Sequence, residues 1–436
     1  MRASWRVLAA HRDLRLVLSA GLVSRAGDWI LLTGLLYRVY AMTGSTVASA
    51  LTMVSSFLPQ VLLGPVAGVF ADRWNRKLTM IAADVLLAAG LLPLLAVHGA
   101  GRVWIVFAVL IWEGVIEQFF SPAELAMVPR LVPDDQLVTA NALSGQVNDI
   151  SRLAGSAIGG LVAAAGGITG VALADAASFA ASAVLLMLVR TSGAVERQVR
   201  PGRALAAVTS DLRAGLRLAT GHRMLRALMI FGLITSVGEG IVGTLFAPFF
   251  RHVLHGSSQG FGVFLAAQAI GGIAGGLLAA SIGQRVRPAR LLSYGAVAFG
   301  LGDLGIFLYP LGYAAVWPAM AGIIIVGLPV ALTMAGLLTL FQQNTADSYR
   351  GRVFGALAAA EGTAMLTGAL AGGYLTRVFG IIPVIAIQGA GYLTAGLLMT
   401  AWLRDRPRPQ HSQARPPPPQ SDPHLPRADE RSRARS

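Results

Sequence analysis

The most constraining feature of this 436-residue sequence is a series of apolar stretches, each long enough to cross a lipid bilayer as a helix. About 20 apolar residues span the hydrocarbon core, and short polar or Gly- and Pro-containing breaks separate the stretches. The predicted spans are residues 14–40, 46–71, 77–98, 103–128, 137–165, 168–190, 222–250, 258–284, 290–309, 313–342, 351–379 and 381–403. The sequence therefore predicts an all-α membrane protein with 12 transmembrane helices.

Composition excludes several classes of protein. Only 13% of the residues are charged and 55% are hydrophobic, whereas a soluble domain carries about 25% charged residues. Cysteine is absent, which removes disulfides, thiolate metal sites and cysteine nucleophiles. The sequence has no phosphate-binding G-x-x-x-x-G-K-S/T loop, no H-E-x-x-H metal pair and no histidine in the middle of a span. We therefore predict a protein that is not an enzyme, holds no cofactor or metal, and does not use ATP directly.

The positive charge of the chain follows a sided pattern. If the N-terminus is cytoplasmic, the inner segments hold 28 of the 35 Lys and Arg residues and the outer ends hold four. Cytoplasmic loops of membrane proteins collect Lys and Arg, so both termini are predicted to be cytoplasmic. The net charge of +14 then reflects topology and attraction to anionic lipid of the inner leaflet, and no nucleic-acid partner is predicted.

The chain divides into two pseudo-symmetric halves. The long inner segment 191–221 separates six spans from six, and its apolar residues recur at a spacing that favours an amphipathic helix on the membrane surface. Residues 155–160 (Gly-Ser-Ala-Ile-Gly-Gly) and 368–373 (Gly-Ala-Leu-Ala-Gly-Gly) repeat at an offset of 213. The predicted parts are residues 1–190 (first six-helix half), 191–221 (cytoplasmic linker), 222–404 (second six-helix half) and 405–436 (disordered Pro- and Arg-rich cytoplasmic tail).

One inner loop carries a recognisable motif. Residues 68–77 read Gly-Val-Phe-Ala-Asp-Arg-Trp-Asn-Arg-Lys. This stretch resembles the signature loop of the major facilitator superfamily, Gly-x-x-x-Asp-Arg-x-Gly-Arg-Arg/Lys, with Asn in place of the second Gly. The resemblance implies a gate in which the acid of the motif faces the helix N-terminus that begins the eleventh span. The predicted gating residues are Gly68, Asp72, Arg73, Asn75, Arg76 and Lys77.

A motif in the fifth span narrows the resemblance. Residues 155–160 resemble the Gly-Pro-x-x-Gly-Gly antiporter motif of drug exporters, with Ser156 where Pro is usual. Segments 24–29, 120–123 and 349–355 are similar to the branch that contains macrolide and enterobactin exporters. The resemblance implies a monomeric, multi-pass protein of the bacterial inner membrane whose two halves rock about a central cavity. The predicted antiporter-like residues are Gly155, Ser156, Gly159 and Gly160.

Charged side chains inside the spans indicate where this cavity lies. A charge at the centre of a bilayer costs about 2.5–3.5 kcal/mol on insertion scales, so it needs a partner, a cavity or a proton. Arg25 and Asp28 are three residues apart and able to pair along one helix face, as are Asp149 and Arg152. The candidate cavity residues are Arg25, Asp28, Glu113, Glu117, Asp149, Arg152, Glu239 and Glu361.

The fourth span carries an acidic stripe. Glu113, Glu117 and Glu124 fall within about 40° of one another on a helix that turns about 100° per residue. Two carboxylates one turn apart repel if both are ionised, so the stripe favours a proton relay; neutralisation by neighbouring helices or inner-loop arginines is the alternative. Three further acids are on spans that the resemblance places at the periphery, and they are predicted to be structural: Asp84, Asp175 and Asp303.

These features together predict a secondary active transporter. We expect it to export an amphipathic small molecule, such as a drug, a macrolide or a natural product, by proton antiport with alternating access. Its expected partners are this substrate, protons and membrane lipid, and the acidic cavity set favours a cationic or neutral cargo. A siderophore exporter of the same fold is the nearest alternative, and it requires unpaired Arg25 and Arg152. A membrane sensor or scaffold acting through residues 405–436 is less favoured, and the same fold also serves uptake.

Overall fold

All regular structure in the described part of the chain is helical. The computed structural model describes residues 7–71, 74–133, 136–193, 204–282, 285–345 and 347–404. The main helices of the first half are α2 (Arg12–Thr43), α3 (Thr46–Ala71), α4 (Arg76–Gly90), α5 (Trp104–Met127) and α6 (Leu137–Met187). The helices that follow are α7 (Ala204–Gly221), α8 (Arg223–Pro248), α9 (Ser258–Ile282), α10 (Pro288–Leu308), α11 (Val316–Gln343), α12 (Asp347–Phe379) and α13 (Ile381–Arg404).

Helix α6 contains two of the predicted spans. It is 51 residues long and is interrupted at Gly167, whose backbone (φ 60°, ψ −147°) is not helical. The interruption lies between the predicted spans 137–165 and 168–190. Eleven helices among the described residues are long and apolar enough to cross a membrane, and α6 supplies two crossings. The prediction of an all-α protein with twelve spans is therefore confirmed.

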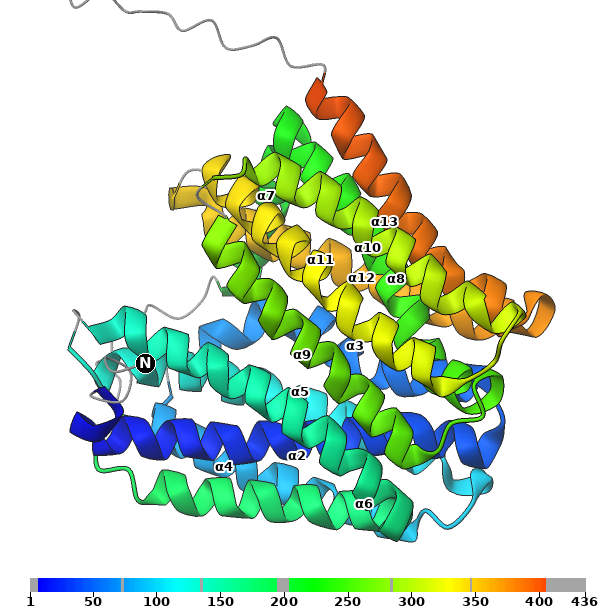
Figure 1. The fold of residues 1–436 in the computed structure, drawn as a ribbon. Helices are drawn as coiled ribbons and strands as arrows, with labels where there is room; N and C mark the ends of the chain where they lie inside the picture. The colour runs from blue at the N-terminus through cyan, green and yellow to red at the C-terminus, as the bar shows by residue number, and fades with distance from the viewer. Residues whose placement is uncertain are drawn as a thin grey trace, which may run out of the picture.

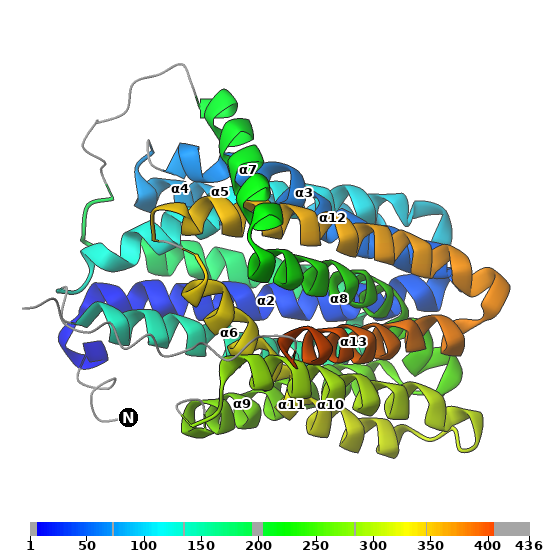
Figure 2. The ribbon, with the colours of Figure 1, turned by 90° about the horizontal axis from the view of Figure 1, so that it is seen from above.

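The transmembrane helices form two bundles. In Figure 1, α2–α6 lie in the lower bundle and α8–α13 in the upper one, and α6 contacts α9 while α3 contacts α12. Helix α7, in the segment predicted to be amphipathic, contacts α12, α8 and α3 (Figure 2). Its position on a membrane surface and the cytoplasmic location of the termini stay predictions, and the tail 405–436 lies outside the described residues.

The two bundles are joined at the end where α2 passes into α3. Tyr37 Oη donates a hydrogen bond to the Gly256 carbonyl (2.9 Å), and Arg251 Nη1 donates one to Tyr37 Oη (3.2 Å). Thr46 Oγ1 donates to the Gly373 carbonyl (2.8 Å). Toward the opposite end, which holds the start of α2 and α7, the bundles spread apart (Figure 1). If the termini are cytoplasmic, this shape is closed toward the outside and open toward the cytoplasm.

Glycines of the antiporter-like motif allow α6 to pack closely on two neighbours. A Cβ added to Gly160 would lie 2.6 Å from the carbonyl oxygen of Ser258 on α9, in the other bundle. Cβ atoms added to Gly155 and Gly159 would instead meet backbone atoms of α2, the former 2.5 Å from the Ala26 carbonyl oxygen. Small residues let helix backbones approach one another in lipid, so this motif positions both the wall of the first bundle and the contact between bundles.

Candidate functional site

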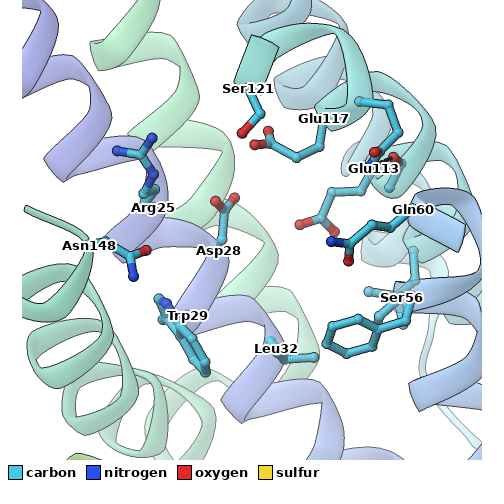
Figure 3. A pocket seen from close by; sticks show the side chains of 14 residues that line it. Arg25, Asp28, Trp29, Leu32, Ser56, Gln60, Glu113, Glu117, Ser121 and Asn148 are labelled. Atoms are coloured by element: carbon cyan, nitrogen blue, oxygen red, sulfur yellow. Dashed lines mark hydrogen bonds between the residues drawn. The ribbon is translucent and has the colours of Figure 1, made fainter. Parts of the chain in front are cut away.

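A cavity of about 400 Å³ lies inside the first bundle. All of its lining residues come from α2, α3, α5 and α6. Trp29 and Phe57 contribute apolar surface. Its charged and amide side chains, most of them labelled in Figure 3, are Arg25, Asp28, Gln60, Glu113, Glu117, Gln118 and Asn148.

Helices α2 and α5 face each other across this cavity. Arg25 and Asp28 are three residues apart on α2, and Glu113 and Glu117 are four apart on α5, so each pair lies on one face of its helix. Figure 3 shows Asp28, Glu113 and Glu117 pointing into the space between the two helices. The structure thus brings together four of the eight residues that the sequence predicts for the cavity.

Arg25 is paired with Glu124 of α5. Arg25 Nη2 donates to Glu124 Oε2 in an ion pair that joins α2 to α5. The Glu124 side chain is 4% exposed and the Arg25 side chain is 22% exposed. Spacing along α2 pointed to Asp28 as a partner for Arg25, but the register of α5 against α2 brings Glu124 to the guanidinium. Glu124, which the candidate set lacked, is therefore the buried partner of a residue that lines the cavity.

A further acid, Asp175 of α6, joins the cavity acids. Asp28, Glu113 and Asp175 each place a carboxylate oxygen within 4.8 Å of the other two. Gly27 makes this approach possible, because a Cβ there would collide with the side chains of Asp175 and Ser178. The prediction of Asp175 as a peripheral structural acid did not anticipate its position beside Asp28 and Glu113.

The internal repeat contained a signal for this position. Asp28 stands 211 residues before Glu239, and Asp175 stands 213 residues before Gln388, which matches the repeat offset closely. In the second bundle, a Cβ added to Gly238 would lie 2.9 Å from Gln388 Cα. The first and last helices of each half therefore touch at corresponding points, Gly27 with Asp175 and Gly238 with Gln388. The repeat of Asp28 and Asp175 as Glu239 and Gln388 is the sequence signal for this contact.

The other four predicted cavity residues lie elsewhere. Asp149 is exposed on α6, and the partly buried Arg152 extends toward α9. These two residues form no ion pair in the part of the chain that the structure describes. Glu239 accepts a hydrogen bond from Tyr392 Oη (2.7 Å) within the second bundle, and Glu361 of α12 lies against α8. The predicted set thus divides into a cavity group and four separate side chains.

The described residues of the gating motif lie at the end of α3 and at the start of α4. Gly68 lies near the end of α3, and Asn75 caps α4 by accepting a hydrogen bond from the Leu78 backbone N–H (3.2 Å). Asp72 and Arg73 lie outside the described residues. The contact of Asp72 with the start of the eleventh span therefore stays a prediction.

Arg76 and Lys77 bind carbonyl groups at the ends of neighbouring helices. Arg76 Nη1 donates to the Ala126 carbonyl (2.7 Å). Lys77 Nζ donates to the carbonyls of Val189 (2.7 Å) and Met187 (3.1 Å). A cation at a helix C-terminus satisfies free carbonyls and complements the helix dipole, so the motif joins α4 to the ends of α5 and α6.

Fold and cavity together define the class of protein. Two six-helix bundles that enclose ionisable side chains at membrane depth are the architecture of major facilitator superfamily transporters. Within that superfamily the chain belongs to the transmembrane secretion effector family, whose model matches residues 4–425. The resemblance drawn from the loop motif is thereby confirmed, and the chain is a multi-pass protein of the bacterial inner membrane.

Relatives of the chain are transporters. It is 28% identical over 395 residues to the uncharacterized MFS-type transporter YfiS of Bacillus subtilis, covering 89% of this chain and 92% of YfiS. It is 24% identical to macrolide efflux protein A of Streptococcus pyogenes, over 76% of this chain and 81% of that protein. It is 25% identical to the enterobactin exporter EntS of Citrobacter koseri, over 97% of this chain and 99% of EntS. These matches agree with the exporter branch that the sequence predicts.

Solved structures share the fold. A bacterial homologue of the iron transporter ferroportin, crystallised in an inward-facing state, superposes with a TM-score of 0.71 at 17% identity, covering 90% of this chain and 98% of that chain. The nucleoside transporter NupG gives a TM-score of 0.75 at 12% identity, covering 89% and 99%. At these identities the similarity shows the common fold alone.

Proposed function

We propose that this protein exports an amphipathic small molecule across the bacterial inner membrane by proton antiport with alternating access. The observation that carries the proposal is the cavity in which Arg25, Asp28, Glu113 and Glu117 meet inside membrane-spanning helices. Ionisable groups at membrane depth are costly and mark substrate or ion pathways. Membership of a secretion effector family supports export as the direction.

Transport would proceed by rocking of the two bundles. The contacts of Tyr37, Thr46 and Arg251 hold one end closed while the other end is spread. With the spread end toward the cytoplasm, cargo enters from the cytoplasm or the inner leaflet. Breaking the contacts of the closed end exposes the cavity to the outside, where protons bind the carboxylates and the cargo leaves.

Glu113 and Glu117 are the proposed proton carriers. They are one helical turn apart and repel each other when both are ionised, so a proton bound by either one relieves the repulsion. Asp28 faces them from α2 (Figure 3). A cationic cargo relieves the same repulsion, and this makes protons and cargo alternative occupants of one acidic surface.

The cavity charge supports a cationic or neutral cargo. Three acids line the cavity together with one arginine, and that arginine is already bonded to Glu124. Trp29 and Phe57 offer apolar surface to the rest of an amphipathic molecule. The macrolide efflux relative supports a cargo of drug-like size.

The similarity to an enterobactin exporter supports a siderophore exporter as the second candidate. An anionic catechol cargo needs unpaired arginines. Arg25 does not meet this requirement, whereas Arg152 has no ion-pair partner among the described residues. Competition between a lipophilic cationic dye and a catechol siderophore for binding to the purified protein separates the two candidates. Deletion of residues 405–436 tests the sensor or scaffold alternative. A sensor or scaffold that acts through this tail should lose its function, whereas a transporter should keep its transport.

Inside-out membrane vesicles with an acidic lumen test the transport proposal. Adding a macrolide or a lipophilic cationic dye should release protons from vesicles that contain the native protein. Glu113→Gln and Glu117→Gln should each abolish this release while the protein stays in the membrane. Asp303→Asn, the same loss of a buried acid in α10, should preserve it. Unchanged proton release in both glutamate variants would reject the relay, and cargo movement in the opposite direction would reject export.

A further inference from the structure

Three carboxyl groups from three helices converge at one side of the cavity. Asp28 of α2, Glu113 of α5 and Asp175 of α6 place their oxygens within 4.8 Å of one another. Asp175 has no exposed surface, and Asp28 and Glu113 are half-buried. The cluster therefore lies where the cavity meets the packed interior of the first bundle.

Two oxygens of this cluster have no hydrogen-bond partner. Asp175 Oδ1 accepts a hydrogen bond from Ser178 Oγ (3.0 Å), but Asp175 Oδ2 is buried without a partner, and so is Glu113 Oε2. A buried acceptor without a partner costs about 1–3 kcal/mol, and here two of them, from different helices, belong to one cluster.

The nearby cation, Arg25, forms its ion pair outside this cluster. Arg25 bonds Glu124, farther along α5, and makes no bond to Asp28, Glu113 or Asp175. The three helices thus present carboxylates that are close in space, partly buried and without an ion-pair partner. Buried charges of this kind are paired or coordinate metal ions.

We propose that Asp28, Glu113 and Asp175 form a binding site for one divalent cation of the Mg²⁺, Mn²⁺ and Ca²⁺ class. Carboxylate oxygens are the ligands that these hard cations prefer. Their metal–oxygen distances are about 2.0–2.6 Å, so ligands on opposite sides of one ion lie about 4–5 Å apart, and the 4.8 Å limit of the cluster fits this spacing. Water from the adjoining cavity completes the coordination. The proposal goes beyond proton antiport, because ion binding here is measurable without any transport.

A bound cation would satisfy both orphan oxygens at once. It would bridge Glu113 of α5 to Asp175 of α6, and Asp28 would add α2, so one ion would fasten three helices of the first bundle. Gly27 is part of this arrangement, since it leaves the space in which Asp175 approaches α2. The ion would also add positive charge to an acidic cavity wall.

Titration of the purified full-length protein with Mn²⁺ tests the site. Free Mn²⁺ is followed by electron paramagnetic resonance in detergent micelles at mildly alkaline pH. The native protein should bind one Mn²⁺ saturably, and Mg²⁺ or Ca²⁺ should displace it. Asp175→Asn and Glu113→Gln should each weaken binding at least about tenfold, since even indirect changes to metal sites have effects of that size. Asp303→Asn, a matched loss of a buried acid in the second bundle, should bind Mn²⁺ as the native protein does.

Two results would overturn the site: no saturable Mn²⁺ binding by the native protein, or equal affinity in Asp175→Asn and Glu113→Gln. Gel filtration establishes that each variant is monodisperse, and Asp28→Asn replaces any variant that is not. Proton release by vesicles in the presence of a chelator separates this proposal from the transport proposal. If exchange persists and Mn²⁺ does not bind, the metal site alone is rejected; if Mn²⁺ binds and no exchange occurs, the antiport alone is rejected.

Discussion

The guanidinium of Arg251 lies over the ring of Tyr37 and joins the two bundles. The Arg251 Cζ atom is 5.4 Å from the centre of the Tyr37 ring, and Arg251 Nη1 donates to Tyr37 Oη at 3.2 Å. Tyr37 Oη in turn donates to the Gly256 carbonyl at 2.9 Å. One tyrosine of the first bundle therefore makes two hydrogen bonds and a cation–π contact with the second.

Removing this guanidinium should open the closed end. A cation–π contact contributes about 0.5–1 kcal/mol at exposed sites, so Arg251→Ala should raise exposure of the interface about two- to fivefold. The chain has no natural cysteine, so Thr46→Cys provides a single labelling site beside Gly373. The rate of its reaction with a membrane-impermeant maleimide is the measurement. Arg102→Ala is the control, because Arg102 bonds the Ala96 carbonyl within its own bundle. Equal labelling rates in Arg251→Ala and Arg102→Ala would show that the Arg251–Tyr37 contact does not hold this end closed.

Enlarging a glycine at the α6–α9 contact should separate the bundles. A Cβ at Gly262 would lie 2.5 Å from the Ser156 carbonyl oxygen and 2.8 Å from Gly160 Cα, and a backbone cannot yield as a flexible side chain does. Gly262→Val should therefore lower the thermal unfolding temperature in detergent and abolish transport. Gly305→Val in α10 meets nothing within 4 Å and should have little effect on either. Native-like transport by Gly262→Val would show that the contact is dispensable.

The break in α6 should require glycine at one position only. Gly167 has φ 60° and ψ −147°, a region that is nearly exclusive to glycine and costs other residues about 1–3 kcal/mol. Gly167→Ala should therefore lower the unfolding temperature. Gly166→Ala is the matched control, since its Cβ would meet nothing within 4 Å and its φ is not positive. If the two variants unfold at the same temperature, the strain argument is wrong.

Loss of Arg25 should destabilise the first bundle. Glu124 is nearly fully buried, and removing one partner of a buried ion pair typically costs about 3–5 kcal/mol because an uncompensated charge remains. Arg25→Ala should show a large drop in unfolding temperature, and the double variant Arg25→Ala/Glu124→Gln should recover part of it. Arg12→Ala breaks a pair with Asp13 whose arginine is 47% exposed, and pairs of that kind contribute at most about 1 kcal/mol. A similar drop for Arg12→Ala and Arg25→Ala would refute the role given to burial.

The membrane spans were predictable because the bilayer imposes a length on each crossing. The predicted span 46–71 coincides with α3, and the predicted span 381–403 ends one residue before α13 does. The continuity of α6 through two spans was not predictable in the same way. The sequence shows a break between two apolar spans at Gly166 and Gly167. It does not show that only Gly167 leaves the helical conformation, so that α6 runs on through both spans.

The contacts between helices were predictable only in part. Periodicity assigns Glu113 and Glu117 to one face of α5, and the cavity confirms their common location. It does not reveal the rotation and register of α5 against α2, and these decide that Arg25 bonds Glu124. The approach of Asp175 to Asp28 depends likewise on Gly27, which has no side chain to block it. This fit between α2 and α6 does not show in the residue pattern of either helix alone.

Every side chain around the acidic cavity is carried by the first bundle. The proposed proton-binding groups would therefore all move with the first bundle. In a chimaera of residues 1–190 with the second half of a relative, the proposed proton-binding groups would come from this protein. Part of the cargo-binding surface would come from the relative. On the proposed mechanism, exchange of the second half would change the range of cargo without altering the groups that bind protons.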